Sequence, residues 1–322
     1  MEQVKRLAKE LLGFLENSPS CYHVTDNFAE MLKKEGYLAL NEQERWDIQA
    51  GGKYFVIRNG SSIIAFRVPK TLKGGFLMAA AHSDSPTFKI KENPEHPVLG
   101  HYVQLNTEKY GGSLMATWFD RPLSVAGRVL AEDKGRIIIK NVCVDQDLLV
   151  IPSVAIHMDR EVNKGTALKA NVDLLPLFGQ GKETGAFRRI VAESAGVAAE
   201  DFLTTDLFLY NRTPATLMGA EEEFVAAPRL DDLQCVFGCL QGFLAAEESD
   251  SVPVLAAVHN EEVGSGTKQG ADSTFLSDVL ERIASCLNMS AEAYRMALSA
   301  SFMLSADNAH ATHPNHPEYA DA

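Results

Sequence analysis

The sequence predicts an α/β fold, in which a mixed sheet flanked by helices is interrupted by an inserted, mainly β domain. Short apolar runs typical of buried strands occur near both ends of the chain and alternate with helical patterns. Between about Lys91 and Phe224, short β-like segments dominate instead. The 322 residues also exceed the usual size of one compact domain. We therefore expect one domain made of residues 1–90 and 225–322, and an inserted domain at residues 91–224.

The first part of the chain contains two helical patterns and a hairpin signal. Leucines recur at helical spacing over residues 7–15, which predicts an N-terminal helix. A second helix is predicted around Phe28–Leu32, with Thr25 as its N-cap. Asn59-Gly60 separates two β-like halves of residues 54–66, and this dipeptide is a strong hairpin signal.

Further along the chain, three apolar runs predict buried strands, at Phe76–Ala81, Val252–Val258 and Ser299–Leu304. Apolar residues at helical spacing predict a helix over Leu233–Leu244. Inside the inserted region we expect strands at residues 136–141, 148–156 and 206–210, and a helix at residues 187–195.

Composition and charge narrow the class of protein. Hydrophobic residues make up 46% of the chain, so a large core is available and a metal would be needed for chemistry rather than for folding. The net charge of −13 disfavours a nucleic-acid partner, because a phosphate-binding surface needs the opposite sign.

The five cysteines include no C-x-x-C pair. Cys235 and Cys239 lie in an apolar helical pattern, which favours buried thiols over metal ligands. This cysteine usage indicates a reducing, cytoplasmic location. We expect no signal peptide and no membrane partner, because no apolar stretch is long enough to span a bilayer.

Four polar clusters collect near the predicted buried strands and the helix. Because the carboxyl ends of strands form the ligand crevice of open α/β sheets, we expect these clusters to converge. Their imidazole and carboxylate groups, without Cys or Lys, are the ligands of a hydrolytic zinc or manganese centre. The clusters are AHSDSP at 81–86, PRLDD at 228–232, HNEEVGS at 259–265 and SADNAH at 305–310.

Three residues of these clusters each have a structural alternative. His82 is either a metal ligand or a satisfied histidine at a strand end. Asp84 either accepts the second ring N–H of His82 or caps the following turn. Asp231 either bridges two metals or caps the helix beside it, a role that Asp232 could take instead.

Glu261 and Glu262 form the most informative pair. Adjacent carboxylates repel each other, which is tolerable on a solvated loop but costly at a strand end. The following Gly264-Ser265-Gly266 permits close approach of a ligand. One glutamate can then bind metal while the other takes a proton from water.

Asp307 follows a predicted strand and is a further candidate ligand, whereas the histidines after it lie among prolines, which favours an irregular surface loop over ligands; these are His310, His313 and His316. Competing chemistry is less coherent. We find no P-loop, no G-x-S-x-G elbow and no G-x-G-x-x-G after a predicted strand.

Taken together, the four clusters closely resemble motifs of the aspartyl aminopeptidase family, and EFVAAPRLDDL at residues 223–233 extends the similarity. IPSVAIHMDREVN at residues 151–163 resembles the family's inserted domain. The resemblance implies a zinc exopeptidase fold and an enzyme that removes N-terminal Asp or Glu from peptides. It further implies that the inserted domain serves dimerisation and substrate contact, and that dimers build a larger tetrahedral particle.

The resemblance also implies two zinc ions per active site. Carried over residue by residue, His82 and Asp307 would hold one zinc, and Glu262 would hold the other. Asp231 would bridge the two ions. The expected ligand set therefore comes from all four clusters.

Three further roles follow from the same similarity. Glu261 would be the general base, and Asp84 would orient His82. His157 matches a histidine of the inserted domain, which is expected near an active site of the same or a neighbouring subunit, touching substrate or metal. The alternative for His157 is a structural role on a β-like segment.

The chain departs from the family pattern in two places. The usual Asn after the bridging aspartate is Asp232 here. Family chains continue past the SAD-x-AH segment, and a further His near their C-terminus completes the second zinc, whereas this sequence stops at Ala322. Two alternatives therefore stay open: an inactive, metal-poor scaffold, and an enzyme of different specificity, namely a neutral aminopeptidase or a metallo-deacylase.

Overall fold

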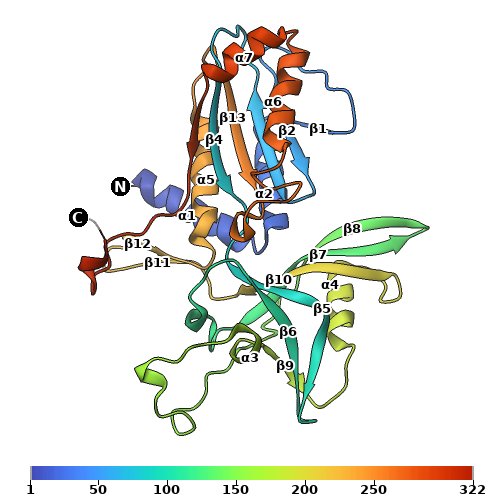
Figure 1. Ribbon diagram of the computed structural model, residues 1–322, viewed down its shortest axis with the longest axis vertical. Helices are drawn as coiled ribbons and strands as arrows, with labels where there is room; N and C mark the ends of the chain where they lie inside the picture. Colours follow the sequence, from blue (N-terminus) through green and yellow to red (C-terminus); the bar gives the residue numbers. More distant parts are fainter. Residues whose placement is uncertain (1, 321–322) are drawn as a thin grey trace. The chain divides into compact units, whose positions relative to one another are not determined.

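The computed structural model describes residues 2–320, which form two compact units (Figure 1). Unit 1 comprises the chain as far as Asn27 together with Pro86–Pro228. Unit 2 comprises Phe28–Ser85 and the chain from Arg229 onward. Each unit is therefore assembled from two separate stretches of the sequence.

Unit 2 is built on a six-stranded mixed sheet in the order β1-β2-β3-β13-β4-β14, which confirms the predicted mixed sheet. β2, β3 and β13 pair antiparallel, whereas β13, β4 and β14 run parallel to one another. These three parallel strands therefore end at the same edge. The strands are β1 (Leu38–Leu40), β2 (Lys53–Arg58), β3 (Ser62–Arg67), β4 (Phe76–His82), β13 (Val252–Val258) and β14 (Phe302–Ser305).

The predicted hairpin between β2 and β3 is confirmed. Asn59 and Gly60 have φ angles of 55° and 71°, and the N–H of Ser61 donates to the carbonyl of Arg58 at 3.3 Å. Positive φ at both central residues is the geometry of a type I′ turn, whose twist matches that of the strands. The turn pairs Arg58 with Ser62.

Helices flank the unit 2 sheet (Figure 1). α6 (Phe275–Cys286) packs into the core formed by one face, which includes Val254 and Ala256. Their neighbours Leu255 and Ala257 are also buried, and alternation along a strand places them on the opposite face. α5 (Leu230–Ala245) contacts β4 and β13. Burial on both faces explains why these strands are continuous apolar runs in the sequence.

One predicted strand boundary in unit 2 is wrong. The strand expected from Ser299 begins at Phe302, because residue 299 ends the helix α7 (Ala291–Ser299). Helical hydrogen bonding continues at the C-terminal end of α7, where the N–H of Ala300 donates to the carbonyl of Met296 at 3.0 Å and the N–H of Ser301 donates to that of Leu298 at 3.1 Å.

Thr25 is not an N-cap, because α2 (Cys21–Lys34) begins four residues earlier. Its hydroxyl instead donates to the carbonyl of Cys21 at 3.2 Å, within the helix. In unit 1, the strand expected at residues 148–156 is reduced to isolated bridges at Leu149, Val150 and Ile151.

Unit 1 contains an antiparallel six-stranded sheet in the order β8-β7-β10-β5-β6-β9. The helix α4 (Ala186–Ala195) packs on its core through Phe187 and Val191. The strands are β5 (Thr87–Val98), β6 (Tyr102–Tyr110), β7 (Leu123–Asp133), β8 (Arg136–Cys143), β9 (Leu177–Gln180) and β10 (Phe202–Asn211). Smaller elements are α1 (Glu2–Glu16), α3 (Ala170–Asp173), β11 (Thr216–Met218) and β12 (Phe224–Ala226).

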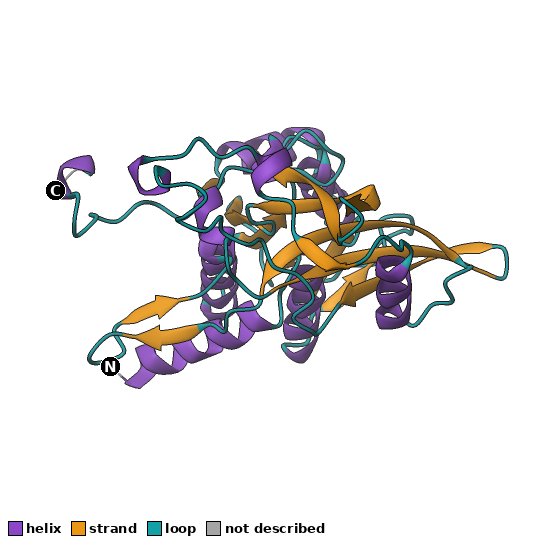
Figure 2. Cartoon of the chain, turned by 90° about the horizontal axis from the view of Figure 1, so that it is seen from below, coloured by secondary structure: helices purple, strands orange, loops and turns teal. Residues whose placement is uncertain are grey.

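In unit 1, α1 lies beside the β11–β12 hairpin (Figure 2), where Lys5 Nζ is 3.2 Å from Glu222 Oε2. None of the helices among residues 2–320 has the length and apolar character needed to cross a membrane. The five cysteines, all within residues 2–320, form no disulfide, and Cys235 and Cys239 are half-buried rather than fully buried.

A charge cluster crosses the unit 1 sheet at Asp206. Its Oδ1 lies 3.0 Å from Lys89 Nζ, and its Oδ2 lies 2.8 Å from an amino nitrogen of Arg128. Tyr22 also donates to Oδ2 at 3.3 Å. Burial would raise the pKa of Asp206, but the hydrogen bonds from Arg128 and Lys89 outweigh it, so the pKa is lowered. The cluster links three strands and the start of α2.

We expect Asp206→Asn to lower the free energy of unfolding by about 2–3 kcal/mol at neutral pH, because it removes the negative charge that pairs with Lys89 and Arg128. Since the pKa of Asp206 is lowered on folding, its contribution is present above the ordinary carboxyl pKa and is lost as the pH falls through the folded value. Urea unfolding at neutral and acidic pH checks both statements. Asp145→Asn is the control, because that ion-paired side chain is 90% exposed. Equal unfolding midpoints for Asp206→Asn and the parent would contradict the prediction.

Candidate metal centre

The parallel strands of unit 2 bring the predicted clusters to one edge of the sheet. β4 ends at His82, which pairs with Val258 at the end of β13. Asp307 follows two residues after β14, whose last residue pairs with Ala80. The start of α5 adds Asp231 and its neighbour.

Three exposed carboxylates surround the Nε2 atom of His82. Oδ1 of Asp231 lies 3.4 Å away, and Oδ1 of Asp307 lies 3.8 Å away. Oε2 of Glu261 lies at 3.9 Å. The His82 side chain is only 4% exposed, whereas the three carboxylates are about half exposed or more. A buried imidazole nitrogen therefore faces an acidic surface that is open to solvent.

Among the described residues, two groups have ligand atoms close enough to hold an ion, with all atoms of a group within 4.8 Å of one another. One joins His82 to three aspartates and the other joins it to two glutamates. The groups are His82, Asp231, Asp232 and Asp307, and His82, Glu261 and Glu262. Only His82 can carry a positive charge in either group, so a divalent cation would relieve the repulsion between the carboxylates. Imidazole and carboxylate donors suit zinc.

Asp84 contacts both halves of the site. Its Oδ1 lies 3.3 Å from Nδ1 of His82, and its backbone carbonyl lies 3.2 Å from the same nitrogen. Its two carboxylate oxygens also accept the backbone N–H groups of Glu261 and Glu262, each at 3.3 Å. With the ring hydrogen on Nδ1, the lone pair of Nε2 points to the carboxylates, where a metal would take it.

The acidic surroundings change the protonation of His82. Burial would lower the pKa of its imidazole, but hydrogen bonding to Asp231 and Asp84 outweighs burial and raises the pKa to about 11. The ring is therefore protonated at neutral pH unless a cation takes the place of the proton.

Asp232 was expected only as a helix cap or as a departure from the family Asn. The structure instead places its fully buried side chain against the backbone of His82, whose N–H donates to Oδ2 at 3.2 Å. Oδ1 has no hydrogen-bond partner among the described residues, and burial raises the pKa of this carboxyl to about 6. Asp231 and Asp232 have non-helical backbone angles, so the regular part of α5 begins after them. No sequence pattern distinguishes the buried aspartate of this pair from the exposed one.

Four predicted histidines lie outside both groups. His157 belongs to unit 1 and lies on an exposed turn rather than on a strand. The other three lie on the exposed tail after β14, where the rings of His313 and His316 are 5.3 Å apart. None of these histidines belongs to a candidate metal group within residues 2–320; the tail residues are His310, His313 and His316.

Comparison with known proteins identifies the family of the chain. The sequence model of the peptidase M18 family, described as aminopeptidase I zinc metalloprotease, matches residues 14–322. The chain belongs to this family. The resemblance found in the motifs is thereby confirmed, and so is the prediction of a zinc metallo-aminopeptidase at the level of the family.

Relatives and solved structures of the M18 family extend over nearly the whole chain. The probable M18 family aminopeptidase 2 of Clostridium acetobutylicum is 43% identical over 329 residues, covering all of this chain and 76% of the relative. The Ape4 chain in its complex with Nbr1 has a TM-score of 0.94 at 36% identity, with 98% of this chain and 66% of that chain covered. The S. cerevisiae mApe1 dodecamer has a TM-score of 0.85 at 30% identity, with 98% of this chain and 74% of that chain covered. The chain thus spans about two thirds to three quarters of the length of these proteins.

We expect binding of the zinc ion held by His82 to weaken about tenfold for each unit by which the pH is lowered between 8 and 7, because this ion must displace the proton of His82. The raised pKa gives the sign, since the metal-free ring is protonated throughout this range. Competition with a chromophoric chelator at several pH values measures the dissociation constant. His82→Asn removes the titrating ring and serves as the control. An affinity of the parent that does not change with pH would refute the expectation.

Proposed function

We propose that the chain is an aminopeptidase that releases an N-terminal acidic residue, Asp or Glu, from peptides. The observation that carries the proposal is the buried Nε2 of His82, which faces carboxylates from three other segments of the chain. Membership of a zinc metalloprotease family supports the same chemistry.

We assign two zinc ions to this site. His82 and Asp307 would hold one ion, Glu262 would hold the other, and Asp231 would bridge them. Two separate ligand groups, one with the aspartates and one with the glutamates, support two ions. The two groups share His82, so the bridging role of Asp231 rests on the motif similarity alone. When bound, the ions supply Lewis-acid activation of the scissile carbonyl and of a water molecule.

Glu261 is the proposed general base. Its carboxylate is 48% exposed and lies 3.9 Å from Nε2 of His82, so it can reach both solvent and the reacting groups. It would take a proton from water and pass it to the leaving amine. Asp84, which accepts the N–H groups of Glu261 and Glu262, would hold the base and the ligand in their relative positions while orienting His82.

Recognition of a peptide N-terminus requires a contact for its charged α-amino group. The α-amino group of the substrate would contact a carboxylate or a bound metal at this site, as an exopeptidase requires. The proposed preference for an acidic first residue rests on the motif similarity of residues 81–86, 228–232, 259–265 and 305–310.

We also propose that the protein self-associates as dimers within a larger tetrahedral assembly. The mApe1 relative was solved as a dodecamer. Unit 1 contains the segment proposed for dimerisation. We propose that His157, which is exposed in this unit, contacts substrate or metal of the same or a neighbouring subunit. Light scattering of the purified protein measures this assembly.

Glu261→Gln tests the base. We expect the variant to bind zinc as the parent does and to lose about 10²–10⁴-fold in kcat, because the amide cannot accept the proton. Zinc content and initial rates on a peptide with N-terminal Asp give both values. Glu281→Gln, an exposed glutamate on α6, is the matched control and should keep full activity. Parental turnover by Glu261→Gln would show that another group is the base.

A substrate panel tests the specificity. Peptides with N-terminal Asp or Glu should give kcat/KM values at least about tenfold above those with Leu or Lys, and N-acetylation of Asp should block cleavage. Fastest cleavage of the Leu peptide would favour a neutral aminopeptidase. Release of acetate from the acetylated peptide would favour a metallo-deacylase. Near-zero zinc content together with no turnover would favour a scaffold protein.

A further inference from the structure

The turn that carries Glu261 and Glu262 rests on three polar residues outside the two candidate metal groups, of which Asn260 and Gln269 are buried and Thr267 is exposed. Asn260 precedes the turn, is 8% exposed and has a φ of +66°. Its Oδ1 accepts from the hydroxyl of Thr267 and from Nε2 of Gln269, both at 2.8 Å. We call Asn260, Thr267 and Gln269 the Asn260 clamp.

The clamp is tied to the sheet through His259. The N–H of His259 donates to Ser62 Oγ at 2.9 Å, and its Nδ1 lies 2.9 Å from Ser61 Oγ. Its Nε2 lies 3.3 Å from Nδ2 of Asn260, so the tautomer with hydrogen on Nδ1 satisfies both ring contacts. Ser62 in turn donates to the carbonyl of Gln269 at 2.7 Å. Both ends of the loop are therefore anchored at the start of β3.

Backbone contacts close the same loop into a compact turn. The carbonyl of Asn260 accepts the N–H of Ser265 at 2.7 Å and that of Val263 at 3.3 Å. A side chain at Gly270 would collide with the Ser265 carbonyl, so only glycine allows this approach. On the outer side of the turn, the backbone N–H groups of Glu261 and Glu262 donate to the carboxylate of Asp84.

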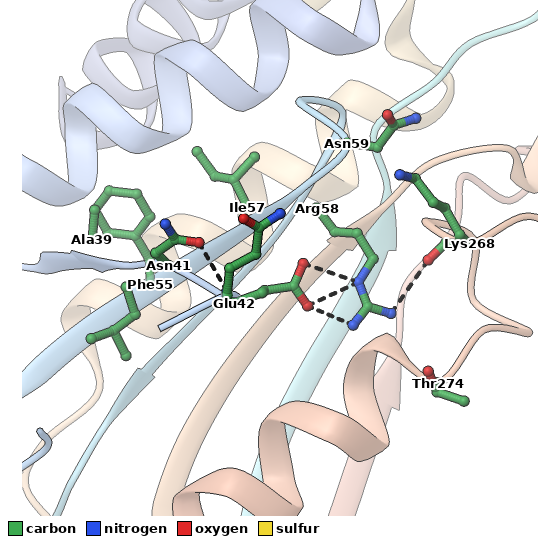
Figure 3. A pocket seen from close by; sticks show the side chains of 11 residues that line it. Ala39, Asn41, Glu42, Phe55, Ile57, Arg58, Asn59, Lys268 and Thr274 are labelled. Atoms are coloured by element: carbon green, nitrogen blue, oxygen red, sulfur yellow. Dashed lines mark hydrogen bonds and ion pairs between the residues drawn. The ribbon is translucent and has the colours of Figure 1, made fainter. Parts of the chain in front are cut away.

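The loop is also held from the side of a cleft of about 740 Å³ beside β1 and β2. Lys268, which lies between the two other clamp residues, offers its carbonyl to Arg58 at 3.4 Å (Figure 3). Arg58 is itself fixed by Glu42 at 2.5 Å and by Asp278 at 2.9 Å. The part of the loop around Lys268 is therefore held by Arg58 as well as by the Asn260 clamp.

We infer that the Asn260 clamp positions Glu261 and Glu262 for the reaction, an inference that rests on the proposed function. Asparagine suits this place because it tolerates a positive φ and its amide both accepts and donates. Glycine would keep the backbone but lose the amide. The clamp sets the affinity for zinc through Glu262 and the turnover through Glu261, and its members act through the turn rather than by touching the reacting atoms.

Two variants remove hydrogen bonds of the clamp while preserving the backbone conformation of the loop. Asn260→Gly keeps the positive φ, and Gln269→Met removes the buried donor at similar volume. Both should raise the dissociation constant for zinc by about 10–100-fold in chelator competition, a readout that does not depend on turnover. At saturating zinc, kcat on the Asp peptide should fall by a similar factor while KM changes less than threefold.

A conservative pair gives the rescue. Thr267→Val removes the hydroxyl and should weaken zinc binding by about threefold to tenfold, whereas Thr267→Ser should remain close to the parent. Ser301→Ala controls for general loss of stability, because its hydroxyl bonds Phe76 N and the Ala297 carbonyl at the other end of β4. It should lower the Tm without changing the zinc affinity.

The outcomes separate this inference from the proposed function. Zinc affinities of Asn260→Gly and Gln269→Met within twofold of the parent would overturn the clamp, as would an equal loss of affinity in Ser301→Ala. A parent that binds zinc but cleaves no peptide would overturn the proposed function, while the affinity changes would still support the clamp. A parent that binds no zinc would overturn both, because the clamp would then have no ligand to position.

Discussion

The buried carboxylate of Asp84 is the interaction on which the unit 2 site depends. A carboxylate in this position must be stabilised by hydrogen bonds, and its partners are the imidazole of His82 and the turn of Glu261 and Glu262. His82 ends β4, whereas the glutamate turn follows β13. The hydrogen bonds of one buried charge therefore fix two segments that are distant in the sequence relative to each other. Strand pairing sets the approximate positions, and this carboxylate joins them.

The residues around that carboxylate differ in burial and in hydrogen bonding. Residues below the sheet edge are buried and paired, as Ser62 and Asn260 are, whereas the carboxylates above it are exposed and crowded. Rigid, satisfied polar groups resist movement, and unsatisfied acidic groups attract cations. The rigid, buried polar residues hold the exposed carboxylates close together, although repulsion between the carboxylates would otherwise move them apart.

Much of the fold and part of the site could be predicted from the sequence. The continuous apolar runs of β4 and β13 are visible because burial on both faces removes polar residues, and Asn59-Gly60 is visible because few residues accept a positive φ. The polar clusters at strand ends follow from the parallel arrangement. Tertiary contacts decided the rest: the burial of Asp232 depends on a neighbouring strand, and the bonds of Asn260 depend on a loop closure ten residues long.

The crowding of carboxylates around His82 has a consequence for the life of the protein before it meets a substrate. The folded unit has an acidic cluster that an unfolded chain would disperse, so any ion that binds only the folded form adds to its stability. That gain is about 1.4 kcal/mol for each tenfold rise in free metal above the dissociation constant. Folding and metal supply are therefore thermodynamically linked, and the lifetime of the chain against unfolding and proteolysis becomes a measure of the zinc available where it is made.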